Sequence, residues 1–173
     1  AGNLKGTYYV GTAVGKLWST TTGLAWTDKS TGGPTTPAYI LGAYKSKLYV
    51  GYTNALWTYD GTTWAQLFSG NIDGTPLVGA VGNNVLYFIT QGPYSRIYMT
   101  DGNQLYHVGT IESDFLPKAA GYLETLQIVG HQTDDSGTKL QWYRLEKNGL
   151  MPIFEYGDDT ADYGGRSSHL SEI

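Results

Sequence analysis

Short runs of alternating apolar and polar residues recur along the chain, and residues that favour turns separate them. Alternation of this kind places every second side chain on one face, which is the pattern of half-buried β-strands. Four of these runs contain similar triplets, which begin 40, 38 and 41 residues apart by position. The sequence therefore predicts a repeat of about 40 residues, present four times. The triplets are Tyr9-Val10-Gly11, Tyr49-Val50-Gly51, Tyr87-Phe88-Ile89 and Ile128-Val129-Gly130.

A second strand pattern and then a turn follow each triplet. The second runs are Lys16-Leu17-Trp18, Ala55-Leu56-Trp57, Arg96-Ile97-Tyr98 and Leu140-Gln141-Trp142. The turns after them are Thr22-Gly23, Asp60-Gly61, Asp101-Gly102 and Asn148-Gly149. Asp-Gly and Asn-Gly accept positive φ angles and favour tight hairpins. We expect a third run to close each hairpin, around Trp26, Trp64, Tyr106 and Ile153-Phe154.

One further strand is expected before three of the triplets, over residues 38–44, 77–81 and 119–123. The repeat then holds four antiparallel strands in about 40 residues, which is the size of a β-propeller blade. We therefore predict an all-β chain, a β-propeller with about four blades of four antiparallel strands. A two-sheet sandwich of short strands accounts for the composition but not for the fixed period. The predicted units of this single domain, residues 1–173, are 1–36, 37–75, 76–116 and 117–166.

The two ends of the chain leave the closure of the propeller open. Residues 1–5 are too short and irregular for a full first strand, and residues 167–173 could supply the missing one. In that case strands from both ends complete one blade and close a four-bladed ring. Otherwise the chain is an arc of a larger propeller, or it closes with other copies.

Composition narrows the possible classes of protein. The 173 residues include 24 Gly, 15 Tyr and 5 Trp, and only 15% of them are charged. Gly and aromatic residues suit short strands joined by tight turns. No apolar run approaches the roughly 18 residues of a membrane helix, so membrane insertion is not expected. Without cysteine there is no disulfide scaffold or thiolate zinc site, and the net charge of −4 makes nucleic acid an unexpected partner.

Two units resemble known propeller repeats. Ser19, Gly23 and Trp26 match the Asp-box (BNR) pattern Ser-x-Asp-x-Gly-x-x-Trp, although Thr21 replaces its Asp. Residues 48–64 are similar to a kelch blade, with one glycine where kelch repeats have two. Both families use these residues structurally. The resemblance implies that the tryptophans pack between blades and do not serve as sugar platforms; they are Trp18, Trp26, Trp57, Trp64 and Trp142.

One face of the predicted propeller is acidic. The loops between second and third strands, together with the links between blades, hold eight of the fifteen acidic residues. Such a face favours cations, polyhydroxylated ligands or a basic partner, although a solvated rim of polar loops has the same composition. Clustered Asp can bind calcium, but the spacing in residues 155–165 is not that of an EF-hand, so we expect no cofactor. The eight acids are Asp73, Glu112, Asp114, Asp134, Asp135, Asp158, Asp159 and Asp162.

Catalysis is the alternative to binding. Sialidases are Asp-box propellers whose active sites use three Arg, a Tyr nucleophile and an Asp, and this chain also has three arginines, Arg96, Arg144 and Arg166. Six blades would need about 240 residues at ~40 per blade, which exceeds this chain. The three histidines lack metal-ligand spacing, and no Gly-x-Ser-x-Gly elbow occurs. We expect no enzyme; the alternative is a segment of a sialidase-like or other glycoside hydrolase propeller.

The sequence thus predicts a non-enzymatic module for binding and recognition, or a structural part of a secreted or virion protein such as a phage tail or surface adhesin. The expected partner is a protein or a glycan, with a homo-oligomer or a larger assembly as the context. The expected location is extracellular or in a virion. The predicted ligand-binding residues are Tyr94, Arg96, Asp134, Asp158, Asp159 and Asp162.

Overall fold

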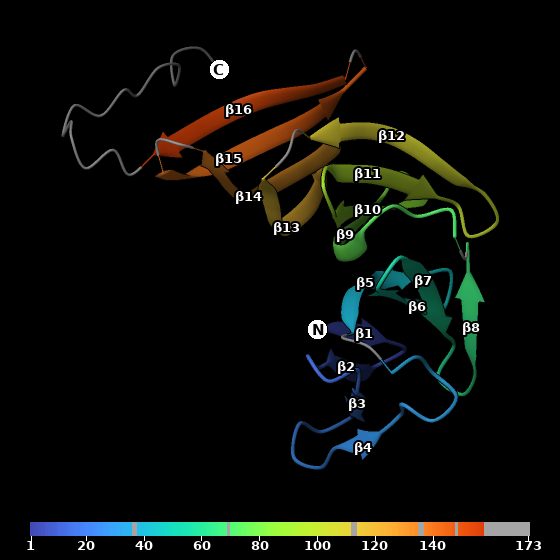
Figure 1. Cartoon of the computed structure of the whole chain (residues 1–173). Helices are drawn as coiled ribbons and strands as arrows, with labels where there is room; N and C mark the ends of the chain where they lie inside the picture. Colours follow the sequence, from blue (N-terminus) through green and yellow to red (C-terminus); the bar gives the residue numbers. More distant parts are fainter. Residues whose placement is uncertain (36–37, 69, 112–113, 135–136, 148, 158–173) are drawn as a thin grey trace.

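The computed structural model describes residues 1–35, 38–68, 70–111, 114–134, 137–147 and 149–157. In these residues the chain forms sixteen β-strands and no helix. The strands make four separate four-stranded antiparallel sheets, each built from four consecutive strands (Figure 1). The all-β prediction and the four units of four strands are therefore confirmed.

Every sheet keeps its strands in chain order. The first sheet contains β1 (Gly2–Leu4), β2 (Thr7–Gly11), β3 (Leu17–Thr20) and β4 (Thr27–Asp28). The second contains β5 (Tyr39–Tyr44), β6 (Lys47–Tyr52), β7 (Ala55–Tyr59) and β8 (Trp64–Leu67). The third contains β9 (Thr75–Gly82), β10 (Val85–Gln91), β11 (Ser95–Thr100) and β12 (Leu105–Ile111). The fourth contains β13 (Phe115–Leu123), β14 (Thr125–Asp134), β15 (Gly137–Glu146) and β16 (Gly149–Gly157).

The predicted strands lie where the repeat places them, with one exception at the N-terminus. All four triplets fall in the second strand of a sheet, and the strands expected before three of them are β5, β9 and β13. The first sheet also has a first strand, because Gly2–Leu4 pairs with Thr7–Tyr9. Residues 1–5 were expected to be too short and irregular for a full first strand; three of them, Gly2–Leu4, form a short one, because the Lys5-Gly6 turn folds them back onto β2. The proposed closing strand, 167–173, lies outside the described residues.

Two-residue turns explain why the first two strands of the second and third sheets pair so tightly. Lys45 and Ser46 have φ angles of 47° and 58°, and Asn83 and Asn84 have 48° and 57°. Positive φ at both central residues matches the right-handed twist of the strands that the turn joins. Between the third and fourth strands of the second sheet, Asp60 Oδ1 accepts hydrogen bonds from the backbone N–H groups of Thr62 and Thr63, both at 2.8 Å.

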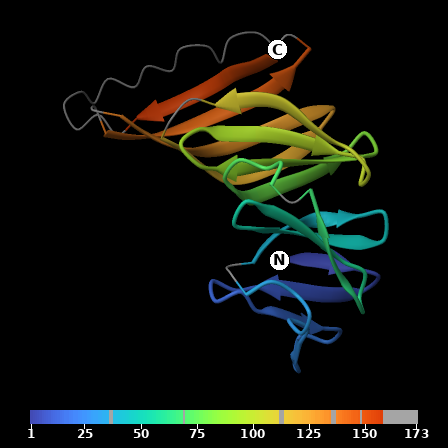
Figure 2. The same cartoon turned by 45° about the vertical axis from the view of Figure 1, so that its right-hand side comes forward.

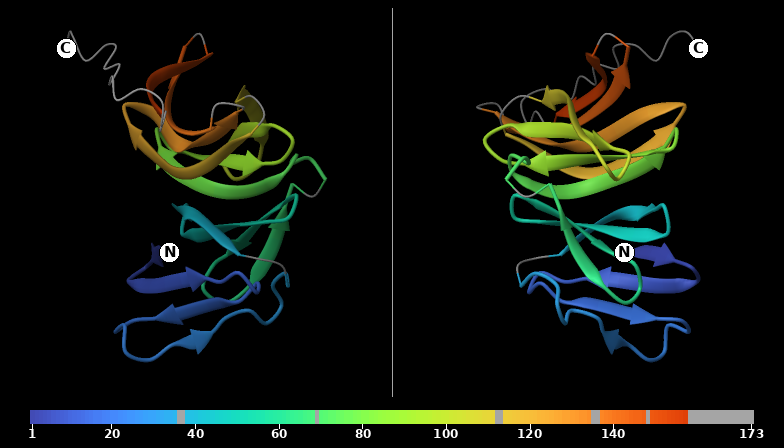
Figure 3. Two further views of the ribbon diagram at one scale, coloured as in Figure 1. Left: turned by 60° about the vertical axis from the view of Figure 1, so that its left-hand side comes forward. Right: turned by 90° about the vertical axis from the view of Figure 1, so that its right-hand side faces the viewer.

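The sheets follow one another in chain order, with the first and fourth at opposite ends (Figures 2 and 3). Within the described residues the four sheets do not close into a ring. Neighbouring sheets pack face to face, which gives three apolar interfaces. The first interface joins Leu4, Tyr9 and Leu17 to Leu48, Val50, Tyr52 and Trp64. The second joins Leu41, Tyr49 and Leu56 to Leu86, Phe88 and Tyr98. The third joins Ala80, Ile89 and Ile97 to Leu126 and Ile128.

The fourth triplet is displaced by one residue relative to the other three. Val50 and Phe88, the middle residues of their triplets, face the preceding sheet and are fully buried. In the fourth sheet the residue at that position is Ile128, the first of its triplet. Because side chains alternate along a strand, a shift of one residue exchanges the two faces. The structural repeat is therefore 40, 38 and 40 residues, counted at Val10, Val50, Phe88 and Ile128.

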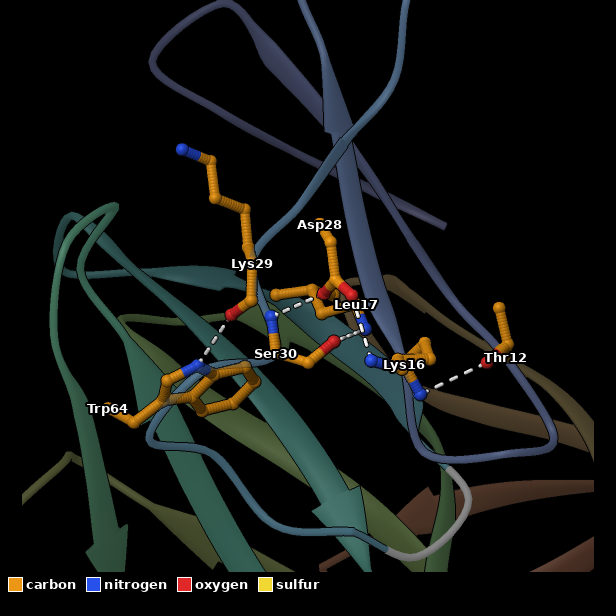
Figure 4. A network of polar contacts seen from close by, with 7 residues as sticks. All are labelled: Thr12, Lys16, Leu17, Asp28, Lys29, Ser30 and Trp64. Carbon is orange, nitrogen blue, oxygen red and sulfur yellow. Dashed lines mark hydrogen bonds and ion pairs between the residues drawn. The ribbon is translucent and has the colours of Figure 1, made fainter.

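A polar network fixes the first link, residues 28–33, between the first and second sheets (Figure 4). Lys16 Nζ lies 2.8 Å from Asp28 Oδ2, and Asp28 Oδ1 accepts the backbone N–H of Ser30 at 2.8 Å. The bond to Lys16, together with hydrogen bonds from Ser30, lowers the pKa of Asp28 to about 2. On the other side, Trp64 Nε1 donates to the carbonyl oxygen of Lys29 at 2.8 Å. The link is thus bonded to both sheets.

The tryptophans do not share one role. Trp64 is buried and Trp57 packs against the first interface, as the repeat resemblance implies. Trp26 and Trp142 are exposed, so neither packs between two of the described sheets. Trp26 precedes a fourth strand of only two residues and lies outside the paired part of its hairpin. Trp142 points away from the third sheet, because its cross-strand partner is Val129 and not Ile128.

Candidate functional site

The predicted ligand-binding residues are only partly brought together. Tyr94 is exposed in the turn between β10 and β11, and Arg96 is the second residue of β11. Arg96 Nη2 lies 2.9 Å from Asp73 Oδ2, so one acid of the predicted acidic face is paired with a cation. Asp134 ends β14, and its side chain is outside the described residues. Three further predicted residues, Asp158, Asp159 and Asp162, also lie outside them.

Asp73 belongs to the second link, residues 68 and 70–74, which crosses from the second sheet to the third. Ile72 anchors this link, since its side chain is buried in the second interface. The backbone N–H of Asp73 donates to the Tyr98 hydroxyl at 3.1 Å. Gly74 has φ +82°, and a Cβ there would lie 2.4 Å from the carbonyl oxygen of Gln91. Only glycine allows this approach, so the link is held in place at three successive residues.

A groove of about 450 Å³ lies beside this link. Its volume is in the range of small-ligand sites. One wall is the second link and the other is the hairpin between β11 and β12. The lining residues are Phe68, Asn71, Tyr98, Asn103, Gln104, Leu105, Tyr106 and His107.

Aromatic rings of the groove are held in place by their neighbours. Tyr98 stacks on Phe88 with ring centroids 5.3 Å apart, and His107 meets Tyr98 edge-on at 5.6 Å. His107 Nε2 lies 3.0 Å from the Thr110 hydroxyl. The hydroxyl of Tyr106, an exposed ring, donates to Gln104 Oε1. Contacts of this kind limit the rotamers of the rings before any ligand arrives, which lowers the entropic cost of binding.

The groove exists because the third sheet has the smaller side chain of Leu105 at the position where the second sheet has Trp64. Trp64 and Leu105 both begin a fourth strand at the same cross-strand register, and both face the preceding sheet. Trp64 fills its junction with the first link, whereas Leu105 leaves space against the second link. The aligned residues are Leu48, Tyr59 and Trp64 in the second sheet, and Leu86, Thr100 and Leu105 in the third.

Among the described residues, the lining combines aromatic faces with side-chain amides and includes no carboxylate, Lys or Arg. Asn and Gln each supply a hydrogen-bond acceptor and two donors, and so can bond to hydroxyl groups in either direction. Aromatic rings offer apolar area of defined orientation. This chemistry suits a neutral, polyhydroxylated ligand. The sequence-based prediction missed the groove, since none of the residues it predicted to bind a ligand is among the lining residues. The run Asn103-Gln104-Leu105-Tyr106-His107 was the available clue.

Residues considered for catalysis or metal binding are scattered. Arg96 pairs with Asp73 near the third sheet, and Arg144 Nε lies 2.5 Å from Glu146 Oε1 on the fourth. Arg166 is outside the described residues. Within the described part of the chain, no group of three or more His, Asp or Glu side chains could hold a metal ion. No helix long and apolar enough to cross a membrane is found there.

Comparisons with other proteins bear on the fold alone. No family model and no curated protein matches the chain. Among solved structures, a chain in a complex of S. cerevisiae dbp5 with nup159, gle1, IP6 and ADP is similar, with a TM-score of 0.52 and 12% sequence identity. The match covers 88% of this chain and 41% of the other. The chain thus spans less than half the length of the one it resembles.

Proposed function

We propose that this chain is a segment of a β-propeller that acts as a non-enzymatic recognition module and binds a glycan in the groove beside the third sheet. Four sheets of four antiparallel strands, each stacked on the next and repeating every 40 residues or so, support the propeller reading. The setting we propose is a secreted or virion protein, which rests on composition. The observation that carries the binding function is the aromatic and amide lining of the groove.

Three properties of the groove favour a sugar over a charged ligand or a basic protein segment. The polar groups of its described lining are amides, two tyrosine hydroxyls and an imidazole, so no fixed charge selects an ion. Its aromatic rings can lie against the C–H face of a pyranose, where apolar area is buried. Its volume admits one or two sugar residues and not a folded partner. The Arg96–Asp73 ion pair lies outside the lining and leaves the groove neutral.

A glycan array probed with the purified chain tests this function, and each hit is then titrated by calorimetry. The key variant is Leu105→Trp, which copies into the third sheet the residue that fills the corresponding space in the second. We expect binding to weaken at least tenfold while the melting curve stays cooperative. Gln104→Ala should weaken binding less, by about threefold to tenfold, since one hydrogen-bonding group is lost.

Tyr94→Ala is the matched control, because Tyr94 is an exposed aromatic residue of the same sheet outside the groove lining. It should leave the affinity unchanged. Loss of binding in Tyr94→Ala with normal binding in Leu105→Trp would move the site to the loop end that the sequence predicts. An array without a single hit for the unmodified chain would contradict the glycan proposal. Turnover of an array glycan would instead support the glycoside hydrolase alternative.

A further inference from the structure

Three side chains of the groove lining also belong to the core beneath it. Phe68 and Leu105 pack against the second interface, and Tyr98 is part of that interface and only 4% exposed. All three line the groove as well. We call them the floor of the groove. Because the floor is mostly apolar, a ligand gains free energy by placing apolar atoms on it.

The Tyr98 hydroxyl brings one polar group to this floor. It accepts a hydrogen bond from the backbone N–H of Asp73 at 3.1 Å, and this bond uses a lone pair of the oxygen. No described residue accepts the proton of the same hydroxyl. Buried polar groups in proteins are normally paired, and an unpaired one costs free energy. The floor is therefore suited to a ligand that brings an acceptor oxygen.

Side-chain amides surround the floor from both walls. Asn71 belongs to the second link, and Asn103 and Gln104 belong to the hairpin between β11 and β12. Within the described part of the chain, nothing bonds to the side-chain amides of Asn71 and Asn103. Each of these amides has donors and an acceptor to offer. A ligand with both a donor and an acceptor can therefore bond to the walls while its apolar part meets the floor.

The hairpin that carries two of the amides is fixed before a ligand binds. Asp101 Oδ1 accepts the backbone N–H groups of Asn103 and Gln104, at 2.8 and 2.9 Å. Lys45 Nζ, from the second sheet, donates to the carbonyl oxygen of Asp101 at 2.8 Å. The turn is thus held both by its own carboxylate and by the neighbouring sheet. A wall that is already ordered lowers the entropic cost of binding.

From these features we infer that the groove selects glycans with an acetamido group, and this inference rests on the glycan-binding function proposed above. An acetamido group consists of a methyl, an N–H donor and a carbonyl acceptor. Phe68 and Leu105 suit the methyl, and the Tyr98 hydroxyl is the donor for the carbonyl oxygen. The amides of the walls can accept the N–H. A plain hexose has a hydroxyl at the same carbon and brings no methyl to the floor.

The charge of the lining narrows the class further. Sialic acids also carry an acetamido group, but they add a carboxylate. The described lining contains no Lys or Arg that could pair with it, and burying an unpaired charge is costly. The expected ligands are therefore neutral glycans that contain N-acetylglucosamine or N-acetylgalactosamine.

Two matched pairs of disaccharides test the selection by calorimetric titration of the purified chain. The pairs are N,N′-diacetylchitobiose against cellobiose, and N-acetyllactosamine against lactose. Within each pair, only acetamido and hydroxyl groups are exchanged. A buried methyl and one net hydrogen bond correspond to roughly a tenfold gain in affinity, so an acetylated member should bind at least that much tighter. In saturation-transfer NMR, its acetyl methyl protons should give the strongest signal.

Tyr98→Phe tests the donor, because it keeps the ring and removes the hydroxyl. It should reduce the preference for the acetylated member about threefold to tenfold. Tyr94→Phe removes a hydroxyl from an exposed tyrosine outside the lining and should leave the preference unchanged. An unchanged preference in Tyr98→Phe would overturn the role of this hydroxyl.

The outcomes separate this inference from the function on which it rests. Array hits confined to glycans without an acetamido group, or no preference within either pair, overturn the selection but leave glycan binding in place. An array without any hit overturns both. Hits that all contain a neutral N-acetylhexosamine, together with a preference that falls in Tyr98→Phe, support the inference.

Discussion

The first and second links between neighbouring sheets meet the next sheet in different ways. The first link packs on Trp64, whose indole fills the junction and donates to the Lys29 carbonyl. The second link crosses the third sheet, where Leu105 stands at the position of Trp64 and a groove of about 450 Å³ remains. The two junctions therefore differ in one side chain at one register position: Trp64 fills the first junction, and Leu105 leaves a groove large enough for a small ligand. In a repeat protein, a departure from the packed unit is where a site can arise.

Converting the packed junction into the open one should have the largest effect on stability. We expect Trp64→Leu to lower the free energy of unfolding by about 3 kcal/mol, because the buried indole and its hydrogen bond to Lys29 are both lost. Urea unfolding followed by circular dichroism measures the change. Trp26→Leu removes an exposed indole from the first sheet and should cost less than about 0.5 kcal/mol. Equal losses in the two variants would mean that Trp64 does not stabilise the junction.

A smaller effect is expected where the second link is held against the third sheet. Gly74→Ala places a methyl group against the Gln91 carbonyl in a backbone conformation that disfavours alanine, and should cost about 2 kcal/mol. Because the link forms one wall of the groove, glycan affinity should fall as well. Gly23→Ala is the control, since Gly23 also has a positive φ but nothing lies near its missing Cβ. If both variants lose equal stability, backbone strain and not the close contact is responsible.

The smallest expected effect is a difference between the two links in how their contribution to stability depends on pH. Asp28, which holds the first link, has a pKa lowered to about 2, chiefly through its bond to Lys16. A carboxyl with a depressed pKa contributes stability above its unfolded pKa near 4, and this contribution is lost as pH falls toward 2. Asp28→Asn should therefore lower the melting temperature by a few degrees, roughly, at pH 6 and by almost nothing at pH 2. Melting curves every half pH unit give the comparison, and a constant difference across that range would contradict it.

The second link should respond differently in the same titration. Two of its anchors are the buried Ile72 side chain and the hydrogen bond from the Asp73 backbone N–H to the Tyr98 hydroxyl, and neither of these two involves a carboxylate. Tyr98→Phe should therefore give a loss of melting temperature that is independent of pH over this range. A loss that disappears at pH 2 would indicate that a carboxylate, and not the backbone, is the partner of Tyr98.

Much of the strand pattern could be predicted from the sequence alone, because hairpins depend on residues that are close along the chain. Alternation and turn residues such as Asp60-Gly61 and Asn83-Asn84 specify hairpins through backbone preferences of a few neighbouring residues. The fourth triplet shows the limit of such reading. Its aligned residues Ile128-Val129-Gly130 resemble the others, yet the face that packs is decided by a shift of one residue. Apolar residues on both faces of a strand leave that choice to the neighbouring sheets.

The candidate site was beyond the reach of sequence reasoning for a related reason. The predicted acidic residues share a loop composition, and that composition alone does not place side chains against one another. The groove instead lies between a link near Asn71 and a hairpin near Tyr106, which are distant in sequence. It differs from the corresponding junction of the second sheet by the size of one side chain, Leu105 in place of Trp64. Whether a side chain fills a junction depends on what crosses above it, and this is a property of packing between sheets.

The sequence by itself determined the class of the protein: four units of four short strands, with their hairpins, in an all-β chain. Period and turn chemistry suffice for this because each hairpin forms from contacts between residues close along the chain. Only the tertiary structure decided which faces are covered, which tryptophans are buried, where the groove lies, and that Tyr8 and Trp142 are left exposed at the two ends. These features depend on how sheets stack, and stacking joins residues about 40 positions apart, which no local pattern records.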